Sequence, residues 1–327
     1  MNNQKYKLSE LTTLIARGIT PKYTDSIDSI SVINQKCIRD GKINFDLCRK
    51  HNHQSKRISS EKILQINDIL INSTGVGTLG RVSQIIDDVS QTTCDSHVTI
   101  IRPDPSKINP SFLGAFTYLN QKIIESLGHG STGQTELSRL DLGDLDVPNL
   151  SDKKQKFIGE FFQYLNKKIE MNQKTNETLE GITKALFKSW FIDFDPVRAK
   201  AEGRSNGLPD EISELFPNSF EDSELGEIPS GWKLGNIDQI ALNPKETAKP
   251  FQMDSSDRYI GLEHMPRESI ALTDSGTAEN LASNKNVFKK EDILFGKLRP
   301  YFKKTGCDQF DGVCSTDIVV VREKFKL

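Results

Sequence analysis

Residues 94–102 read CDSHVTIIR, and residues 314–322 read CSTDIVVVR. Both stretches begin with cysteine, continue into a run of β-branched residues and end on arginine. A short β-branched run bounded by polar turn residues is typical of a buried strand. The same strand pattern therefore occurs twice in a chain of 327 residues, a length that accommodates two ordinary domains.

Two further matches occur in the same order. Tyr6-Lys7-Leu8 corresponds to Trp232-Lys233-Leu234, and residues 67–70 (NDIL) correspond to residues 291–294 (EDIL). The separation changes by only a few residues, as differences in loop length would produce. An internal repeat of this kind predicts two copies of one fold. We name residues 1–150 the first copy and residues 229–327 the second copy, which we expect to be partial.

Each copy combines Ile- and Val-rich runs with shorter helical patterns. We expect strands at 69–72, 98–101 and 318–321, and a helix at 111–127 that Asn109 caps and Pro110 begins. The predicted class is α+β. It consists of a domain of mixed strands and short helices, a long coiled-coil-like helix, and a second, incomplete copy of the domain.

The long helix is expected at residues 151–192, with Ser151 as its N-terminal cap. Apolar residues recur there every seven positions, and such a stripe must pack on another helix. A helix of this span is about 60 Å long. Its polar middle either fixes the register of a helix pair or faces water. The packing residues are Ile158, Leu165, Asn172, Leu179, Leu186 and Trp190.

A connector at residues 193–228 follows, rich in Gly, Pro, Ser and acidic residues. No counterpart of the long helix follows the second copy, so that helix lacks an intrachain partner. We expect it to pair with another copy of the chain, a separate fragment or a partner subunit.

Composition limits the function. The net charge is −2, so any contact with nucleic acid must come from local basic patches. Neither a membrane span nor a secretory signal is expected, and the cytoplasm is the predicted compartment. The five cysteines form no CxxC pair. Cys48, His51 and His53 cluster in the sequence but are too few for a zinc site, so no metal is expected.

The segment 75–80 (GVGTLG) matches a dinucleotide-binding fingerprint, which requires a helix to follow. Residues 81–86 (RVSQII) alternate like a strand instead, so we predict a hairpin loop whose glycines let backbone N–H groups approach a phosphate or a base edge. A purely structural tight turn is the alternative. The candidate nucleic-acid contacts in this loop are Ser73, Thr74, Gly75, Gly77, Thr78, Gly80 and Arg81.

Two further segments are basic. Residues 36–62 contain Lys36, Arg39 and Arg57, which suit phosphate contact or simply form a solvated surface. In the second copy, the place of the glycine loop is taken by a basic and aromatic loop. Its candidate contacts are Lys297, Arg299, Tyr301 and Lys303.

No catalytic residues are predicted. Residues 109–112 (NPSF) differ from the tetrapeptide of amino-methyltransferases in having Ser at the third place, and capping explains them. Asp193 and Asp195 resemble half of a nuclease metal site but lack the partnering residues.

Three other segments resemble a known family. Residues 130–134 (GSTGQ), 186–200 (LFKSWFIDFDPVRAK) and 224–232 (ELGEIPSGW) are similar to the conserved central region of type I restriction-modification specificity subunits. So are Leu137, Leu140, Val147-Pro148, Gln155 and residues 179–183 (LEGIT). On this resemblance Ser131, Thr132 and Gln134 join the candidate DNA contacts.

The resemblance implies two target-recognition domains held apart by two antiparallel conserved helices, each domain reading one half of a split target in double-stranded DNA. A helix of about 60 Å can separate half-sites by one to two helical turns. Modification subunits that use S-adenosylmethionine methylate adenine, and a restriction subunit that uses ATP and Mg²⁺ cleaves. The chain itself would hold no cofactor. The alternatives are the recognition part of a single-chain methyltransferase or nuclease, and a stand-alone DNA-binding regulator.

Overall fold

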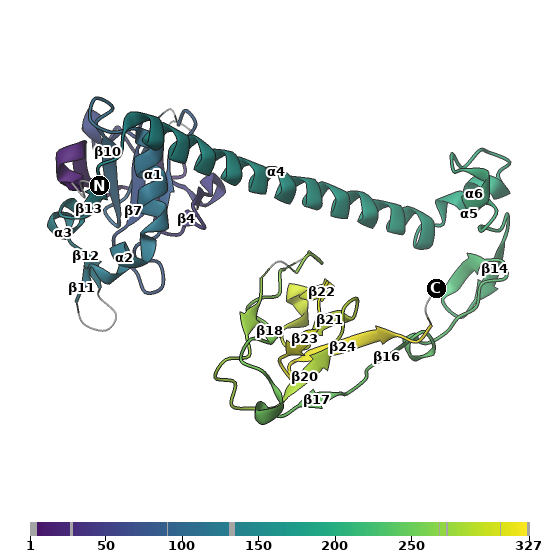
Figure 1. The fold of residues 1–327 in the computed structure, drawn as a ribbon. Helices are drawn as coiled ribbons and strands as arrows, with labels where there is room; N and C mark the ends of the chain where they lie inside the picture. Colours follow the sequence, from purple (N-terminus) through teal and green to yellow (C-terminus); the bar gives the residue numbers. More distant parts are fainter. Residues whose placement is uncertain are drawn as a thin grey trace. The chain divides into compact units, whose positions relative to one another are not determined.

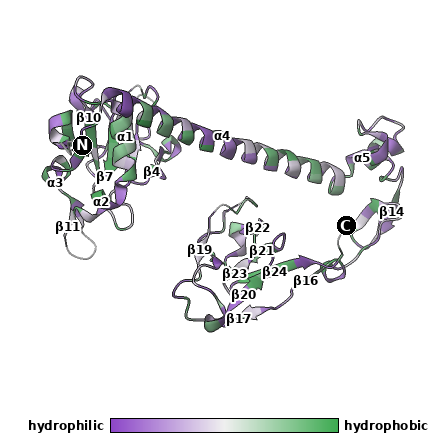
Figure 2. Cartoon of the chain, in the orientation of Figure 1, coloured by the Kyte–Doolittle hydropathy of each residue, from purple (hydrophilic) through white to green (hydrophobic). Residues whose placement is uncertain are grey.

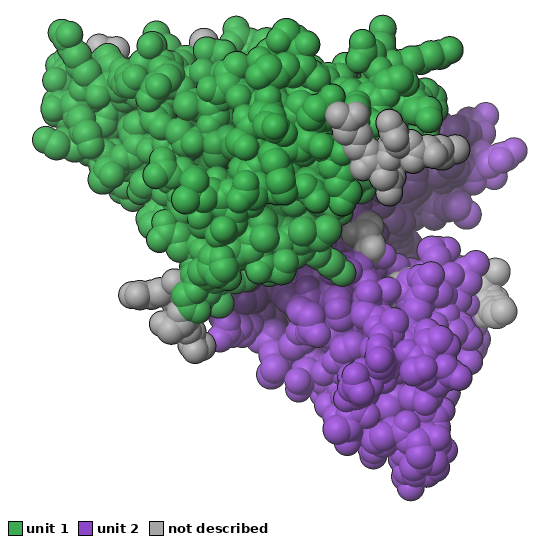
Figure 3. Space-filling model, turned by 60° about the vertical axis from the view of Figure 1, so that its left-hand side comes forward, with its two compact units in different colours: residues 1–169 green, residues 170–327 purple. Residues whose placement is uncertain are grey.

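The computed structural model describes residues 5–26, 29–89, 91–130, 135–267, 269–272, 274–307 and 309–325. The chain forms two compact units, residues 1–169 and residues 170–327 (Figure 3). Strands and helices are mixed in it and one helix is long, which confirms the predicted α+β class (Figure 1). Within the described ranges, every helix is too short or too polar to cross a membrane.

The first copy is built on a four-stranded antiparallel sheet in the order β2-β10-β7-β8. A second sheet has the order β6-β3-β9, with β3 and β9 parallel. The strands predicted at 69–72 and 98–101 are confirmed as β7 and the first part of β10. The bounds are β2 Thr12–Arg17, β3 Ile30–Ile33, β6 Arg49–His51, β7 Ile69–Asn72, β8 Val82–Gln84, β9 Thr92–Cys94 and β10 Val98–Pro103.

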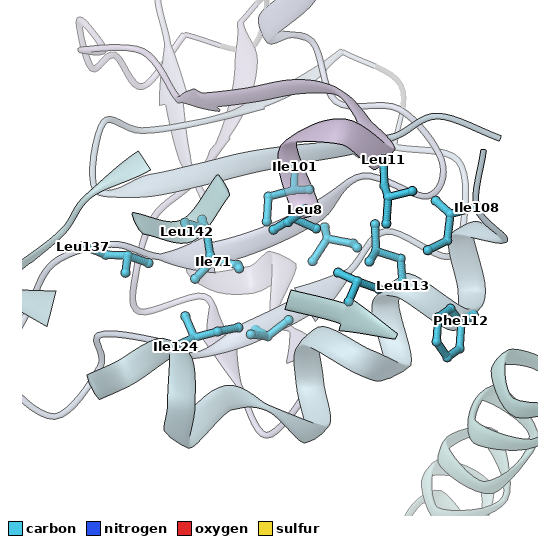
Figure 4. Packing of buried hydrophobic residues seen from close by; sticks show 13 residues of the cluster. Leu8, Leu11, Ile71, Ile101, Ile108, Phe112, Leu113, Ile124, Leu137 and Leu142 are labelled. Carbon is cyan, nitrogen blue, oxygen red and sulfur yellow. The ribbon is translucent and has the colours of Figure 1, made fainter. Parts of the chain in front are cut away.

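Helices α1 (Pro110–Leu119) and α2 (Gln121–Ser126) cover one face of the main sheet. The core lies between these helices and the sheet (Figure 4). Figure 4 shows Ile71 and Ile101 of the sheet facing the same interior as Leu113 and Ile124 of the helices. All four side chains are fully buried. Complete burial of an aliphatic side chain of this size stabilises the fold by about 1.5–3 kcal/mol.

The single helix expected at 111–127 is wrong, because the chain breaks at Asn120 into α1 (Pro110–Leu119) and α2 (Gln121–Ser126). The Asn120 side-chain amide and its backbone N–H both donate to the Phe116 carbonyl, at 2.8 and 3.1 Å. Asn120 itself has φ of −99° and ψ of 17°, outside the α-helical region. The predicted cap is confirmed: Asn109 Oδ1 accepts from the Phe112 N–H at 3.0 Å, and Pro110 is the first helical residue.

The start and the end of the first copy are paired, because β1 (Lys5–Lys7) runs antiparallel to β13 (Asp146–Pro148). The loops between the main elements contain shorter pieces of structure. These are β4 Ile38–Arg39, β5 Lys42–Ile43, β11 Gly128–His129, β12 Glu136–Leu137 and α3 Arg139–Gly143.

The second copy repeats the strand order of the four-stranded sheet and the parallel strand pair of the second sheet, which has five strands here and three in the first copy. One sheet has the order β16-β24-β21-β22, and the other has the order β17-β20-β23-β18-β19, with β18 and β23 parallel. The strand predicted at 318–321 is confirmed as part of β24. The bounds are β16 Ala241–Leu242, β17 Thr247–Ala248, β18 Arg258–Ile260, β19 Gly276–Thr277, β20 Lys285–Phe288, β21 Ile293–Gly296, β22 Thr305–Cys307, β23 Gly312–Cys314 and β24 Ile318–Glu323.

The repeated cysteines occupy matching places in these sheets. Cys94 of β9 lies opposite Ile33 of the parallel strand β3. Cys314 of β23 lies opposite Ile260 of the parallel strand β18. Both thiols are fully buried, so each behaves as a small apolar side chain of the core.

Both copies contain the same buried ion pair. In the first, Arg102 of β10 donates from Nε and Nη2 to the two oxygens of Asp68, each at 2.8 Å. In the second, Arg322 of β24 donates to Asp292 through the same atoms at the same distances. Only 1% and 3% of the two aspartates is exposed. Each aspartate directly precedes β7 or β21, so the ion pair fixes where that hairpin strand begins.

The long helix α4 runs without interruption from Asp152 to Phe191, which confirms the helix predicted at 151–192. Its first turns pack on the first copy. Gln155 accepts from the Asn109 N–H at 2.9 Å, and Gln163 donates to the Ser111 hydroxyl at 3.0 Å. Gly159 lies against the start of α1, where an added Cβ would approach the Phe112 nitrogen to 2.6 Å.

The segment expected as a connector is folded. It contains α5 (Asp195–Ala201), α6 (Asp210–Ser213) and a hairpin of β14 (Phe220–Ser223) and β15 (Gly226–Pro229). Aromatic rings join it to the end of α4. The Trp190 and Phe216 ring centroids lie 5.8 Å apart, and those of Phe191 and Phe216 lie 6.2 Å apart.

We predict that Asp68→Ala destabilises the first copy and Asp292→Ala the second. Each change leaves a partly buried arginine without the carboxylate that accepts two of its hydrogen bonds, which costs about 1–3 kcal/mol. The loss should be smaller in the second copy, because Arg322 keeps its contact with Glu246. Hydrogen–deuterium exchange should show faster exchange in β7 and β10 for the first variant and in β21 and β24 for the second. The exposed Asp87→Ala is the control and should change neither pattern. Exchange that rises equally in both copies for either variant would contradict the prediction.

Candidate nucleic-acid interface

The glycine loop, residues 73–81, connects β7 to β8. The Gly80 N–H donates to the Asn72 carbonyl at 2.8 Å, and the Leu79 N–H donates to the Gly75 carbonyl at 3.0 Å. Gly75, Gly77 and Gly80 have φ of 105°, 71° and 81°, a region that favours glycine. The segment following it is strand β8, as predicted, so the requirement for a dinucleotide-binding helix is not met here.

The hydroxyl groups of this loop bond within the protein. Ser73 is fully buried, and its Oγ lies 2.6 Å from Thr99 Oγ1. Thr74 Oγ1 lies 2.7 Å from His97 Nδ1, and the Thr78 hydroxyl donates to the Thr74 carbonyl at 3.3 Å. Ser73 therefore supports the sheet and does not belong to the candidate surface.

The outer part of the loop is open. Val76 is 83% exposed, and a Cβ added to Gly77 would meet no atom within 4 Å. Arg81 donates from Nη2 to the Gly77 carbonyl at 2.9 Å and so holds the tip of the loop in place. The other N–H groups of its guanidinium could still donate to a ligand. A ligand would therefore meet the backbone at residues 76–77 beside one guanidinium group.

The β4–β5 hairpin lies next to the glycine loop. Gln35, just before it, links the two: its carbonyl accepts from the Asn72 side-chain amide at 2.9 Å, and its Oε1 accepts from the Thr74 hydroxyl at 3.3 Å. The exposed Lys36 and Arg39 belong to this hairpin region. The structure thus brings these two predicted cations close to the glycine loop.

Arg57 is exposed and follows β6. Its neighbour Lys56 donates to the Thr20 carbonyl at 2.9 Å, which ties this segment to the loop before β3. Nearby, the Arg49 guanidinium carbon lies 3.3 Å from the centre of the Tyr23 ring. Sequence reasoning missed the contact between Tyr23 and Arg49, because the two residues are far apart in the chain.

Ser131, Thr132 and Gln134 lie outside the described residues. The strands on either side of them are β11 and β12, which pair with each other. Leu137 of β12 donates its N–H to the Ser73 carbonyl at 2.9 Å, so the base of this hairpin adjoins the base of the glycine loop.

The basic loop of the second copy, residues 297–304, connects β21 to β22 and so has the same position as the glycine loop. A single turn at Pro300–Phe302 is flanked by Arg299 and Lys303, whose φ values are 52° and 48°. Lys297, Arg299, Tyr301 and Lys303 are all exposed. The Arg267 guanidinium carbon lies 3.9 Å from the centre of the Phe302 ring, so the two side chains stack.

The histidine and aspartate clusters have structural partners. His51 is fully buried; its Nδ1 accepts from the Lys22 N–H at 2.9 Å, and its Nε2 lies 2.8 Å from the Lys56 carbonyl. Asp193 and Asp195 bond to Lys188 and Ser189 in the last turn of α4. Both ring nitrogens of the histidine and both aspartates therefore stabilise local structure.

The predicted seam of α4 divides into two groups. Ile158 packs on the core of the first copy, and Trp190 packs on the connector. Leu165, Leu179 and Leu186 are 43%, 55% and 46% exposed, and Asn172 is exposed between them. Figure 2 shows apolar and polar residues alternating along this helix, so an apolar stripe remains uncovered by the described residues.

Comparisons with known proteins give one family. A family model described as "Type I restriction modification DNA specificity domain" matches residues 2–181. The HindI specificity subunit of Haemophilus influenzae is 28% identical over 300 residues, 88% of this chain and 63% of its own length. The MjaIX specificity subunit of Methanocaldococcus jannaschii is 35% identical over 177 residues, 53% of this chain and 38% of its own length.

Among solved structures, the type I restriction-modification S subunit from M. genitalium is 15% identical, with a TM-score of 0.44. The match covers 100% of this chain and 74% of that one. The chain spans 63% of the HindI subunit, which is less than two thirds of that relative's length.

Two glycines allow the loop geometry to be tested. We predict that Gly80→Asn lowers the free energy of unfolding by about 1–3 kcal/mol, since an added Cβ would lie 2.9 Å from Cα and Cβ of Glu125. Gly77→Asn should leave stability nearly unchanged, because its surroundings are open and asparagine tolerates a positive φ. Thermal unfolding of both variants measures this. An equal loss for the two would show that Gly80 is not confined by α2.

Proposed function

Because the chain belongs to the type I restriction modification DNA specificity domain family, we propose that it is the sequence-reading subunit of a restriction-modification complex. It binds a bipartite target in double-stranded DNA. It directs adenine methylation by modification subunits that use S-adenosylmethionine, and cleavage by a restriction subunit that uses ATP and Mg²⁺. The chain itself contributes recognition and no catalytic group, and it acts in the cytoplasm.

One observation supports this proposal most directly. The two copies share a sheet order and a buried ion pair, yet the hairpin loop at the same position is glycine-rich in one and basic and aromatic in the other. Shared scaffolds with different loops suit two surfaces that read different sequences. A regulator that binds one repeated sequence would instead favour matching loops.

The chemistry of the two loops fits DNA in different ways. In the basic loop, Arg299 can donate two bonds to a guanine edge, and Tyr301 offers an exposed ring. The glycine loop offers backbone N–H groups at residues 76–77 beside Arg81, which suits a phosphate or a base edge. Lys36 and Arg39 then add phosphate contacts and affinity that depends on salt.

We further propose that the apolar stripe of α4 packs against a partner helix. Leu165, Leu179 and Leu186 are close to half exposed, and leaving such a stripe in water would forgo its burial energy. The partner is a helix of another copy of the chain, a separate fragment or a modification subunit. Asn172 in the middle of the stripe would fix the register of that pairing.

For the DNA role, we predict that Arg299→Ala weakens binding to the chain's own target by about 1–3 kcal/mol and relaxes discrimination at one position. The target is first identified by mapping methylated adenines after co-expression with the modification subunit, and binding is then measured on target and random duplexes. Lys290→Ala, an exposed cation outside the loop, is the control with the same change of charge. Equal losses on both duplexes for Arg299→Ala would contradict base reading by this loop.

For the helix, we predict that Leu179→Glu combined with Leu186→Glu weakens self-association of the chain at micromolar concentration. Each change places a charge in an apolar seam, where it must lose its hydration. Asn166→Glu adds one negative charge, as each of the two substitutions does, at an exposed position outside the stripe and should leave association unchanged. Analytical ultracentrifugation measures both, and a wild-type chain that sediments as a stable monomer would argue against self-pairing.

A further inference from the structure

Two thiols lie together at the base of the β4–β5 hairpin. The sulfur atoms of Cys37 and Cys48 are 3.9 Å apart. The backbone on each side is already held: the Asn44 N–H donates to the Cys37 carbonyl at 2.8 Å, and the Cys48 N–H donates to the Phe45 carbonyl at 3.0 Å. Both cysteines are free thiols, so only hydrogen bonds and no covalent bond join the two ends of this segment.

The surroundings of the pair favour a thiolate. The Cys37 sulfur accepts from the Cys48 thiol and, at 3.4 Å, from the Asn34 N–H. These bonds lower the pKa of Cys37 to about 7. The same hydrogen bond raises the pKa of Cys48, so the negative charge rests on Cys37. Cys37 is 1% exposed and lies beside the half-buried Cys48.

The other cysteine of this copy differs. Cys94 is fully buried in β9, and burial raises the pKa of its thiol far above the usual range. A buried neutral thiol is inert, whereas a thiolate is the species that attacks disulfides. Reactivity in the first copy should therefore be concentrated at the Cys37–Cys48 pair.

We propose that Cys37 and Cys48 form a reversible disulfide on reaction with a small-molecule disulfide such as oxidised glutathione. The thiolate of the pair attacks the S–S bond of the oxidant and releases one glutathione thiolate, which leaves a mixed disulfide. The second cysteine loses its proton, attacks that mixed disulfide and expels the other glutathione. Two cysteine thiols are thus oxidised to one disulfide, while one glutathione disulfide is reduced to two thiols.

The bond would close the loop that presents Arg39. Residues 40 and 41 of this loop have φ of 52° and 73°, as in a two-residue hairpin turn. The Gly41 carbonyl accepts from the Ser83 hydroxyl at 2.9 Å, so the tip is fastened to β8. A disulfide at the base would add a covalent link to the hydrogen bonds there, and the hairpin would unfold locally less often.

The test uses the full-length chain under native conditions. It is incubated with oxidised glutathione, its remaining thiols are blocked by alkylation, and its peptides are mapped by mass spectrometry. We expect one disulfide joining Cys37 to Cys48, which a dithiol reductant reverses. Its rate of formation should rise with pH through about 7, since the thiolate is the attacking species. Hydrogen exchange at residues 38–47 should be slower in the oxidised chain.

Two variants separate the pair from other thiols. Cys307→Ala should form the same disulfide at an unchanged rate, whereas Cys48→Ala should form none. Because Cys37 is a core residue, the wild-type map decides the question even if a variant unfolds. The proposal is overturned if both cysteines remain reduced, if each carries its own glutathione, or if the bond forms only in denaturant. None of these readouts involves DNA, so they are independent of the proposed function.

Discussion

The buried contact between an aspartate and an arginine is the interaction on which each copy of the fold depends. Asp68 receives two bonds from Arg102 and a third, at 2.8 Å, from the Gln65 N–H. Asp292 receives the same set from Arg322 and the Lys289 N–H. A buried carboxylate requires this degree of compensation. Because the aspartate ends the turn before the hairpin strand, its position sets the register of β7 or β21 against β10 or β24.

This arrangement separates the scaffold from the loop that it presents. The contact lies at the start of the hairpin strand, and the loop lies at its other end, after Asn72 in one copy and after Gly296 in the other. Changes in the loop therefore need not disturb the buried charge. The positive φ of Arg299 strains the backbone locally. The sheet tolerates this strain because the buried contact that stabilises it lies at the other end of the strand.

Sequence patterns predicted the elements whose signals are local. The β-branched runs marked β7, β10 and β24, and the heptad spacing marked α4 nearly to its last residue. Asn120 was missed because an asparagine within a helical pattern does not reveal that its side chain will bond to Phe116. Ser73 was predicted to belong to the DNA-binding surface. Its hydroxyl instead bonds to Thr99, and the sequence could not show this contact because the two residues lie far apart in the chain. Pairs of this kind, including Tyr23 with Arg49, follow from tertiary packing.

The long helix α4 also has two faces with different roles: one docks on the first copy and the other carries the apolar stripe. One face carries Gln155, Gly159 and Gln163, which dock on the first copy through amide bonds and a close backbone approach. The face with Leu165 and Leu179 stays exposed. Amide contacts fix the rotation of the helix about its own axis, because they are directional, whereas an apolar stripe alone would tolerate small rotations. Within the first compact unit, the polar docking face therefore determines which way the side chain of Leu165 points from the first copy.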